Sequence, residues 1–183
     1  MSNLPPWRLG EWALADDFAK IAQQWAPIRR ILEDEALFGL GDPSVSGWSC
    51  GQHAGHSILV AQTIAERIEG NLADPDRHKG ETPPEVAYRV LTAGGFPRGS
   101  AESPADVHPE RHTREHFLPL LSSTVASWES LRSRSRELPD CPARYPHFRL
   151  GPLSSTEWVR MCAAHNAHHL AVVRDIAGEE AAS

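Results

Sequence analysis

The segment 154-SSTEWVRMCAAHNAHHLAVVRDIAG-178 decides the fold of this 183-residue chain. Its apolar and histidine side chains recur every three or four residues, as in a helix that packs one face against a core. The residues on that face are Trp158, Cys162, His165, His169, Val172 and Ile176. Ser154 and Glu157 have the spacing of a capping box at a helix start, and Gly178 supplies a stop. We therefore expect one long amphipathic helix here.

Three other segments show the same periodicity, at about residues 14–32, 52–70 and 112–137. Pro27 lies inside the first and should kink or briefly interrupt it, whereas Gly70 is a plausible end of the second. The glycine-rich stretch 38–51 and the proline-rich stretch 139–152 are expected to be loops. Since no stretch shows a convincing period of two, the sequence predicts an all-α four-helix bundle formed by a single domain, residues 1–183.

A long connection at residues 73–111 separates the second and third expected helices. It is rich in proline and glycine, and only residues 85–92 have the pattern of a short helix. A connection of this length is usually functional, so we expect it to cover or shape a pocket.

Composition excludes several classes of protein. The chain has 18 lysines and arginines against 24 aspartates and glutamates, a formal charge of −6, and this argues against a nucleic-acid partner. No uncharged apolar stretch is long enough to cross a membrane. The 3 cysteines contain no CxxC pair, which argues against a disulfide scaffold or a thiolate zinc site. A reducing cytoplasm is therefore the expected location.

The ten histidines are the unusual feature of the composition. His165 and His169 are four residues apart, so both imidazoles project from the core face of the last helix. A shared divalent ion would satisfy both rings, although two core histidines bonded to backbone or water are the structural alternative. His56 on the second helix is the candidate third ligand, with His53 as a rival one turn earlier. Three histidines with open positions would be typical of a catalytic metal site.

Two short motifs carry a family resemblance. Trp48-Ser49 followed by His56, and the late run His165-Asn166-Ala167-His168-His169, resemble the DinB/YfiT-like superfamily of four-helix bundle proteins. The resemblance implies His56, His165 and His169 as ligands of one divalent ion, zinc or nickel. It also implies a function for some members as transferases or isomerases that use a low-molecular-weight thiol, mycothiol or bacillithiol. Many relatives carry glutamine shortly after the last histidine, where this chain has Ala171, Val172 and Val173, and this difference weakens any expectation of polar support there.

The other histidines have several interpretations. His53 and His168 are expected to flank the site as supporting residues. His108, His112 and His116 are spaced by fours and form a competing ligand set, but their charged neighbours favour a solvated helix start; His116 could also line the mouth of the site. His78 and His147 lie in expected loops and are predicted to be solvated, and Cys50 and Cys162 to be small buried fillers.

The sequence supports two functional hypotheses. The first is a metal-binding protein that acts on a small molecule, with a thiol as a possible second cofactor. The second is a metal-free bundle that serves as a binding module, which the apolar residues after His169 favour. A homodimer is compatible with both, because bundles often bury an apolar face against a second copy.

Overall fold

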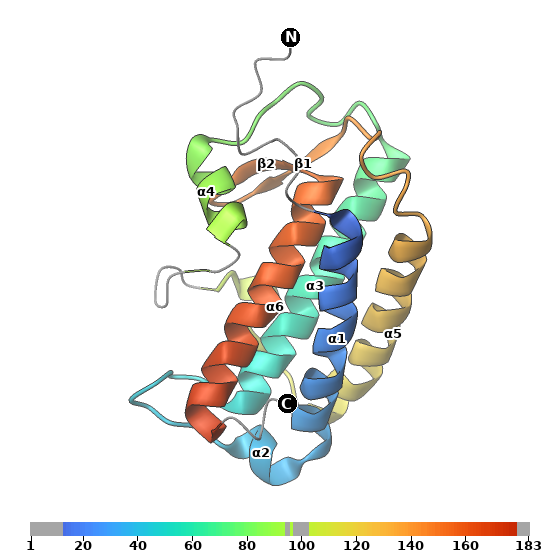
Figure 1. Cartoon of the computed structure of the whole chain (residues 1–183). Coiled ribbons are helices and arrows are strands. Elements are labelled where there is room, and N and C mark those ends of the chain that lie inside the picture. Colours follow the sequence, from blue (N-terminus) through green and yellow to red (C-terminus); the bar gives the residue numbers. More distant parts are fainter. Residues whose placement is uncertain (1–12, 94–95, 97–102, 179–183) are drawn as a thin grey trace.

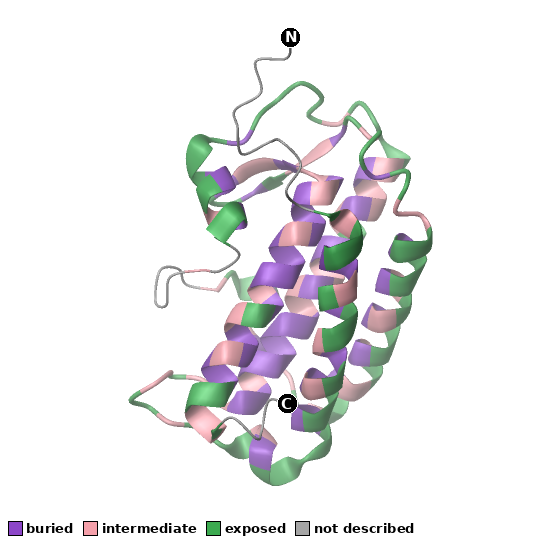
Figure 2. Cartoon of the chain, viewed as in Figure 1, coloured by how far each residue is buried: buried purple, intermediate pink, exposed green. Residues whose placement is uncertain are grey.

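The computed structural model describes residues 13–93, 96 and 103–178, and four long helices form its body (Figure 1). These are α1 (Leu14–Glu33), α3 (Cys50–Ala73), α5 (Arg114–Ser133) and α6 (Ser155–Ala177). Helix α3 packs against α1, α5 and α6, and α1 also packs against α5 and α6. Figure 2 shows the consequence: buried residues dominate α6 and α3, whereas α1 and α5 expose their outer faces.

The periodicity of the sequence predicted the four long helices with small errors at their ends. Helix α6 begins at the expected capping box, in which the Glu157 amide donates to Ser154 Oγ and the Ser154 amide to Glu157 Oε2. Gly178 ends the helix with a φ of 85°, a conformation that favours glycine. Helix α1 continues through Pro27 without interruption, so of the two expected effects, a kink or a brief break, the break is wrong.

Helix α3 is longer than predicted at both ends. It starts at Cys50 because Ser49 and Gln52 form a capping box, and it runs past Gly70 to Ala73. Gly55 has a packing role, since a Cβ there would collide with the ring of Phe117 on α5. The missing side chain therefore lets α3 and α5 approach closely at the residue that precedes His56.

The connections contain more regular structure than expected. Helix α2 (Glu35–Gly39) is a single capped turn, with the Asp34 side chain accepting from the Leu37 amide at 3.0 Å. Residues 73–111 include α4 (Glu85–Ala93), close to its predicted range, and the 3-10 turns η2 (Ala105–Val107) and η3 (Pro109–Arg111).

The expected loop at 139–152 is wrong in one respect, because it contains an antiparallel hairpin. Strands β1 (Arg144–His147) and β2 (Gly151–Ser154) pair with Tyr145 opposite Leu153. Each strand has four residues and a proline, too short for a period of two to be visible in the sequence. The hairpin and α4 lie at the end of the body where α6 begins, while α2 lies at the opposite end (Figure 1). The chain is otherwise helical in its described part, so the prediction of an all-α fold is confirmed in its coarse form.

No helix in the described part of the chain is long and apolar enough to span a membrane.

Candidate metal centre

The structure brings together the three histidines that the sequence singled out. His56 lies in the second turn of α3, and His165 and His169 lie one turn apart on the adjacent helix α6. One nitrogen from each ring lies within 4.8 Å of the other two. The ring centroids are 5.0 Å apart for His56 and His165, 4.8 Å for His56 and His169, and 4.5 Å for His165 and His169. Three imidazole nitrogens this close are positioned to bind one metal ion.

The hydrogen bond of His56 leaves one of its nitrogens available as a ligand. Its Nδ1 donates to the main-chain carbonyl of Val107 in η2 at 2.8 Å. The proton must therefore reside on Nδ1, which leaves the Nε2 lone pair for an ion. This arrangement, in which a backbone carbonyl orients an imidazole, is typical of metal-binding histidines. The 73–111 connection thus contributes to the site through Val107.

His53 supports His169 in a similar way. The Nδ1 atoms of the two rings are 2.9 Å apart, and His53 Nε2 lies 2.9 Å from Ser46 Oγ. A neutral ring donates from only one nitrogen, so one Nδ1 donates and the other accepts. If His169 binds an ion through Nε2, its Nδ1–H donates to His53, and His53 donates from Nε2 to Ser46. His53 is therefore a supporting residue, and it supplies the polar partner for His169 that Ala171 cannot.

His165 tests whether a metal fits. Its Nδ1 is buried, and by geometry it has no hydrogen-bond partner among the described residues. An unpartnered buried ring nitrogen is costly unless something absent from the chain binds it. The donor set of three imidazoles suits zinc, nickel, copper and iron. The residues therefore fit a divalent transition metal.

Burial keeps the cluster neutral. Desolvation is the main cause that lowers the pKa of His56 to about 4, even though its bond to Val107 favours the charged form. Burial likewise lowers the pKa of His165 and of His169 well below the ordinary value, and the neighbouring histidines add to the effect. Since a metal ligand must be a neutral imidazole, the site is ready to bind an ion at neutral pH without releasing protons.

Aromatic rings enclose the cluster on two sides. The Trp48 ring stacks on His169 at 6.3 Å with an interplanar angle of 23°, and its centroid lies 5.0 Å from that of His56. Phe96 presents its edge to His165 at 6.1 Å. These apolar walls lower the local polarity and therefore strengthen electrostatic interactions within the site.

The remaining histidines are distributed over several environments. His168 packs edge-on against His169 at 5.1 Å and against Phe96 at 6.2 Å, beside the cluster as expected.

The competing set of His108, His112 and His116 does not form a three-ligand group within the described part of the chain. His112 and His116 instead stack on each other, with centroids 4.3 Å apart, and His116 is exposed. His108 lies edge-on to Trp48 at 5.4 Å.

His147 corrects a prediction, because it is buried in the hairpin and not solvated. Its Nδ1 accepts from the amides of Arg149 and Leu150, each at 3.1 Å. Burial, with help from Arg67 and Arg149, lowers the pKa of His147 to about 4. His78, in contrast, is exposed and pairs with Glu81, as expected of a loop residue. Cys50 and Cys162 are buried free thiols, also as expected.

Sequence reasoning missed three contributors to the site. The Val107 carbonyl is invisible to it, since any residue offers one. No role in the site was predicted for the Trp48 ring, and Phe96 lies in the long connection with no periodic neighbour. For Trp48 the signal was present in the family motif, where tryptophan accompanies the histidine.

Comparison with known proteins gives one family. The model of the DinB superfamily matches residues 11–173, which include all three histidines of the cluster. No curated protein and no solved structure gives a match.

Proposed function

The chain belongs to the DinB superfamily, and on that premise we propose that it is a single-domain four-helix bundle that binds one divalent ion through His56, His165 and His169. The observation that carries the proposal is the convergence of three neutral imidazoles, one of which has a buried Nδ1 that no described residue partners. Zinc and nickel are the preferred ions, because imidazole ligands suit both.

We propose further that the centre reacts with a small molecule and that a low-molecular-weight thiol takes part. A divalent ion with three protein ligands keeps open positions, where it lowers the pKa of a bound water or thiol. Around it, Val107 orients His56 and His53 orients His169. Trp48 and Phe96 restrict the access of water to the cluster. These residues prepare a site that binds and orients a reactant and limits competing hydrolysis.

Metal analysis tests the first part of the proposal. Wild-type protein, stripped and then titrated with zinc or nickel in a calorimeter, should bind one ion per chain. His165→Ala and His169→Ala should lose that binding, while His116→Gln, on an exposed position of α5, should retain it. If the two alanine variants keep full occupancy, the assignment of the ligands is wrong, and a protein that binds no ion at all would favour the metal-free binding module.

The reaction needs a separate screen. The metal-loaded protein should turn over electrophilic substrates in the presence of mycothiol, bacillithiol or glutathione, and His165→Ala should not. Absence of turnover with all three thiols would reject the transferase or isomerase activity but would not affect the proposed metal site.

The oligomeric state and the partners need their own experiments. Sedimentation tests whether the protein is a homodimer. Binding assays with duplex DNA and with lipid vesicles test the expected absence of nucleic-acid and membrane partners.

A further inference from the structure

A second polar group shares a helix face with the metal centre. His56, Val60, Thr63 and Arg67 are spaced by four, three and four residues, so they lie on one side of α3. Val60, Thr63 and Arg67 are half-buried, whereas Ile58, Ala61, Ile64 and Ile68 on the core side are fully buried. The face that begins at His56 is therefore less covered than the core face and ends at a cation.

Within the described part of the chain, no carboxylate pairs with Arg67. Among the described residues its guanidinium makes no hydrogen bond or ion pair; it lies over the rings of Tyr145 at 5.2 Å and Trp158 at 4.8 Å. Desolvation lowers the pKa of Arg67, and the electrostatic effects of Tyr145, Asp106 and Glu66 oppose this. None of its N–H donors is therefore engaged by the residues that the structure describes, which is unusual for a partly buried arginine.

The contact with Trp158 gives the approximate distance between Arg67 and the candidate metal centre. Trp158 and His165 are seven residues apart on α6, about 10 Å along the helix axis. Arg67 is eleven residues, or about three turns, from His56 on α3. Its side chain reaches Trp158, however, so the guanidinium lies about two helical turns from His165. A small organic molecule of six to eight chain atoms spans about that distance.

His147 adds a neutral donor next to this cation. Its ring centroid is 5.5 Å from that of Trp158, so His147 and Arg67 both contact the same indole. Because its Nδ1 accepts two main-chain hydrogen bonds, the proton of the neutral ring resides on Nε2. An arginine fork and an imidazole N–H on one aromatic ring form a donor set for a carboxylate.

The geometry points to Arg67 as the anchor for a carboxylate on the molecule that reacts at the metal centre, with His147 as a second donor. This inference rests on the proposed function, because it takes the histidine cluster as the reacting end. It restricts the substrate or thiol to one that carries an anionic carboxylate about 10 Å from its reactive group. Trp158 and Tyr145 hold the guanidinium in place before the ligand arrives, which reduces the entropy lost on binding.

Arg77 provides a matched control. It lies over the same Tyr145 ring at 5.5 Å, but it also pairs with Asp74 at 3.6 Å. Removing Arg77 therefore deletes a similar cation–π contact without deleting an unpaired cation. Any effect confined to Arg67 variants belongs to the free guanidinium and not to the contact with the aromatic ring.

The test uses two probes of equal length, 6-mercaptohexanoate and 6-mercaptohexan-1-ol, with the zinc-loaded full chain in a calorimeter. Wild-type and Arg77→Met protein should bind the carboxylate about tenfold more tightly than the alcohol. Arg67→Met should bind the two equally, and Arg67→Lys should keep part of the difference. An equal affinity for both probes in wild-type protein, or a preference that persists in Arg67→Met, would overturn the inference.

A second measurement tests the anion site independently of metal binding. In metal-free protein, the Nε–Hε resonance of Arg67, assigned by its loss in Arg67→Lys, should shift saturably with hexanoate and not with hexan-1-ol. A shift in a protein that binds no zinc would reject the proposed function but keep the anion site. No shift with hexanoate would reject the anion site whatever the zinc result, and it decides the matter even if Arg67→Met fails to fold.

Discussion

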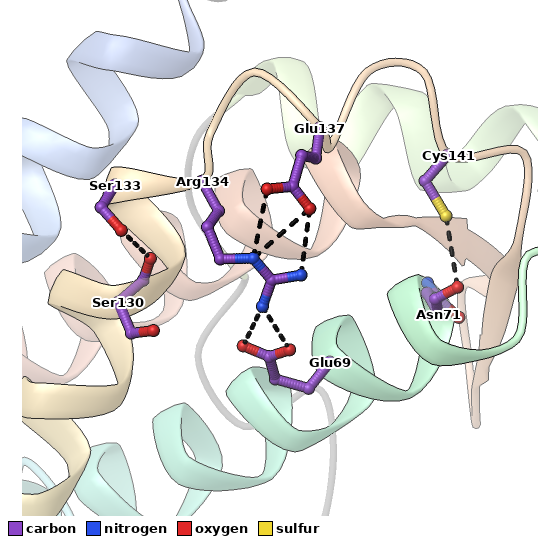
Figure 3. A network of polar contacts seen from close by, with 7 residues as sticks. All are labelled: Glu69, Asn71, Ser130, Ser133, Arg134, Glu137 and Cys141. Carbon is purple, nitrogen blue, oxygen red and sulfur yellow. Dashed lines mark hydrogen bonds and ion pairs between the residues drawn. The ribbon is translucent and has the colours of Figure 1, made fainter.

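The polar side chains at the two ends of helix α3 differ in the partners that surround them. Near its C-terminus, Arg134 donates to both Glu69 and Glu137, at 2.9 and 3.0 Å, while Cys141 donates to the carbonyl of Asn71 (Figure 3). Near its N-terminus, three imidazoles converge and one ring nitrogen has no partner. At the first end, ion pairs between residues of the chain neutralise the charges, although Asn71 Oδ1 is buried there without a partner among the described residues. At the second end, the unpartnered atom belongs to a group of three possible metal ligands. The contrast supports the proposal that the histidine cluster, and not the Arg134 network, binds a ligand.

Exposure strengthens the contrast. The Arg134 side chain is 37% exposed, and its ion pairs raise its pKa, chiefly through Glu137 and then Glu69. The histidines are buried or half-buried, and desolvation lowers the pKa of each of the three. One end is therefore a solvated, charged network and the other a dehydrated, neutral one, although α3 contributes to both.

The largest expected effect is on metal affinity. His169→Ala should weaken zinc binding by more than about 100-fold, because loss of even an outer partner of a ligand typically costs 10–100-fold. Arg134→Met, at the other end of α3, should leave the affinity unchanged. Competition calorimetry with a chelator of known affinity measures both. Equal losses in the two variants would mean that the effect is global destabilisation and would remove the distinction between the ends.

The next effect is the pH dependence of stability in the metal-free protein. The pKa of His56 and that of His147 fall from about 6.5 in the unfolded chain to about 4 in the folded one. Between these values the unfolded state binds more protons, so the free energy of unfolding should decrease as pH falls from 6.5 to 4. Each such histidine contributes about 1.4 kcal/mol per pH unit. Urea unfolding at pH 7, 6 and 5 measures the slope.

One variant locates part of the source of that slope. His147→Gln should reduce the slope by the share of one histidine. The ion pair of Glu137 with Arg134 lowers the pKa of that carboxyl, so the opposite end keeps its charges in the same pH range. A flat stability profile between pH 6.5 and 4 would show that the histidines are solvated and that the two ends do not differ.

A smaller effect should follow from removing the support of a ligand. His53→Ala leaves the Nδ1 of His169 without its partner and should weaken zinc binding by about 10–100-fold. His53→Asn, which can accept through its side-chain oxygen, should recover part of the loss. Isothermal titration with zinc separates the two variants. An affinity equal to wild type in His53→Ala would mean that the ring only fills space.

The candidate ligands could be predicted from sequence, and their support could not. The spacing of His165 and His169 on an apolar stripe assigns both to one face, and the motif that contains Trp48 and His56 completes the set. The partner of His56 is a main-chain carbonyl, and no side-chain pattern identifies it. His53 was recognised as a neighbour, but its bond to His169 depends on how α3 and α6 pack.

The short elements of the fold could not be predicted from the sequence either. The long helices have enough turns for a periodic signal, but α2 has five residues and each hairpin strand four. Such short elements depend on contacts distant in sequence: Arg144 of β1 binds Glu157 of α6 at 2.9 Å, across 13 residues. The burial of His147, and with it the donor pair beside Arg67, follows from that hairpin. The part of the site that sequence reasoning missed is therefore the part that tertiary packing creates.

The smallest effect is expected at the C-terminal end of α3, where Arg134 pairs with Glu69 and Glu137. Arg134→Met removes contacts with two carboxylates, but exposed ion pairs contribute little, because water competes for the charges and salt screens them. The midpoint of thermal unfolding should therefore fall by no more than about 2 °C, and less at high salt. Differential scanning calorimetry at two salt concentrations tests this. A large, salt-independent decrease would show that Arg134 acts as a buried anchor, and the ion pairs at this end of α3 would then be as costly to disturb as the buried histidines at the other.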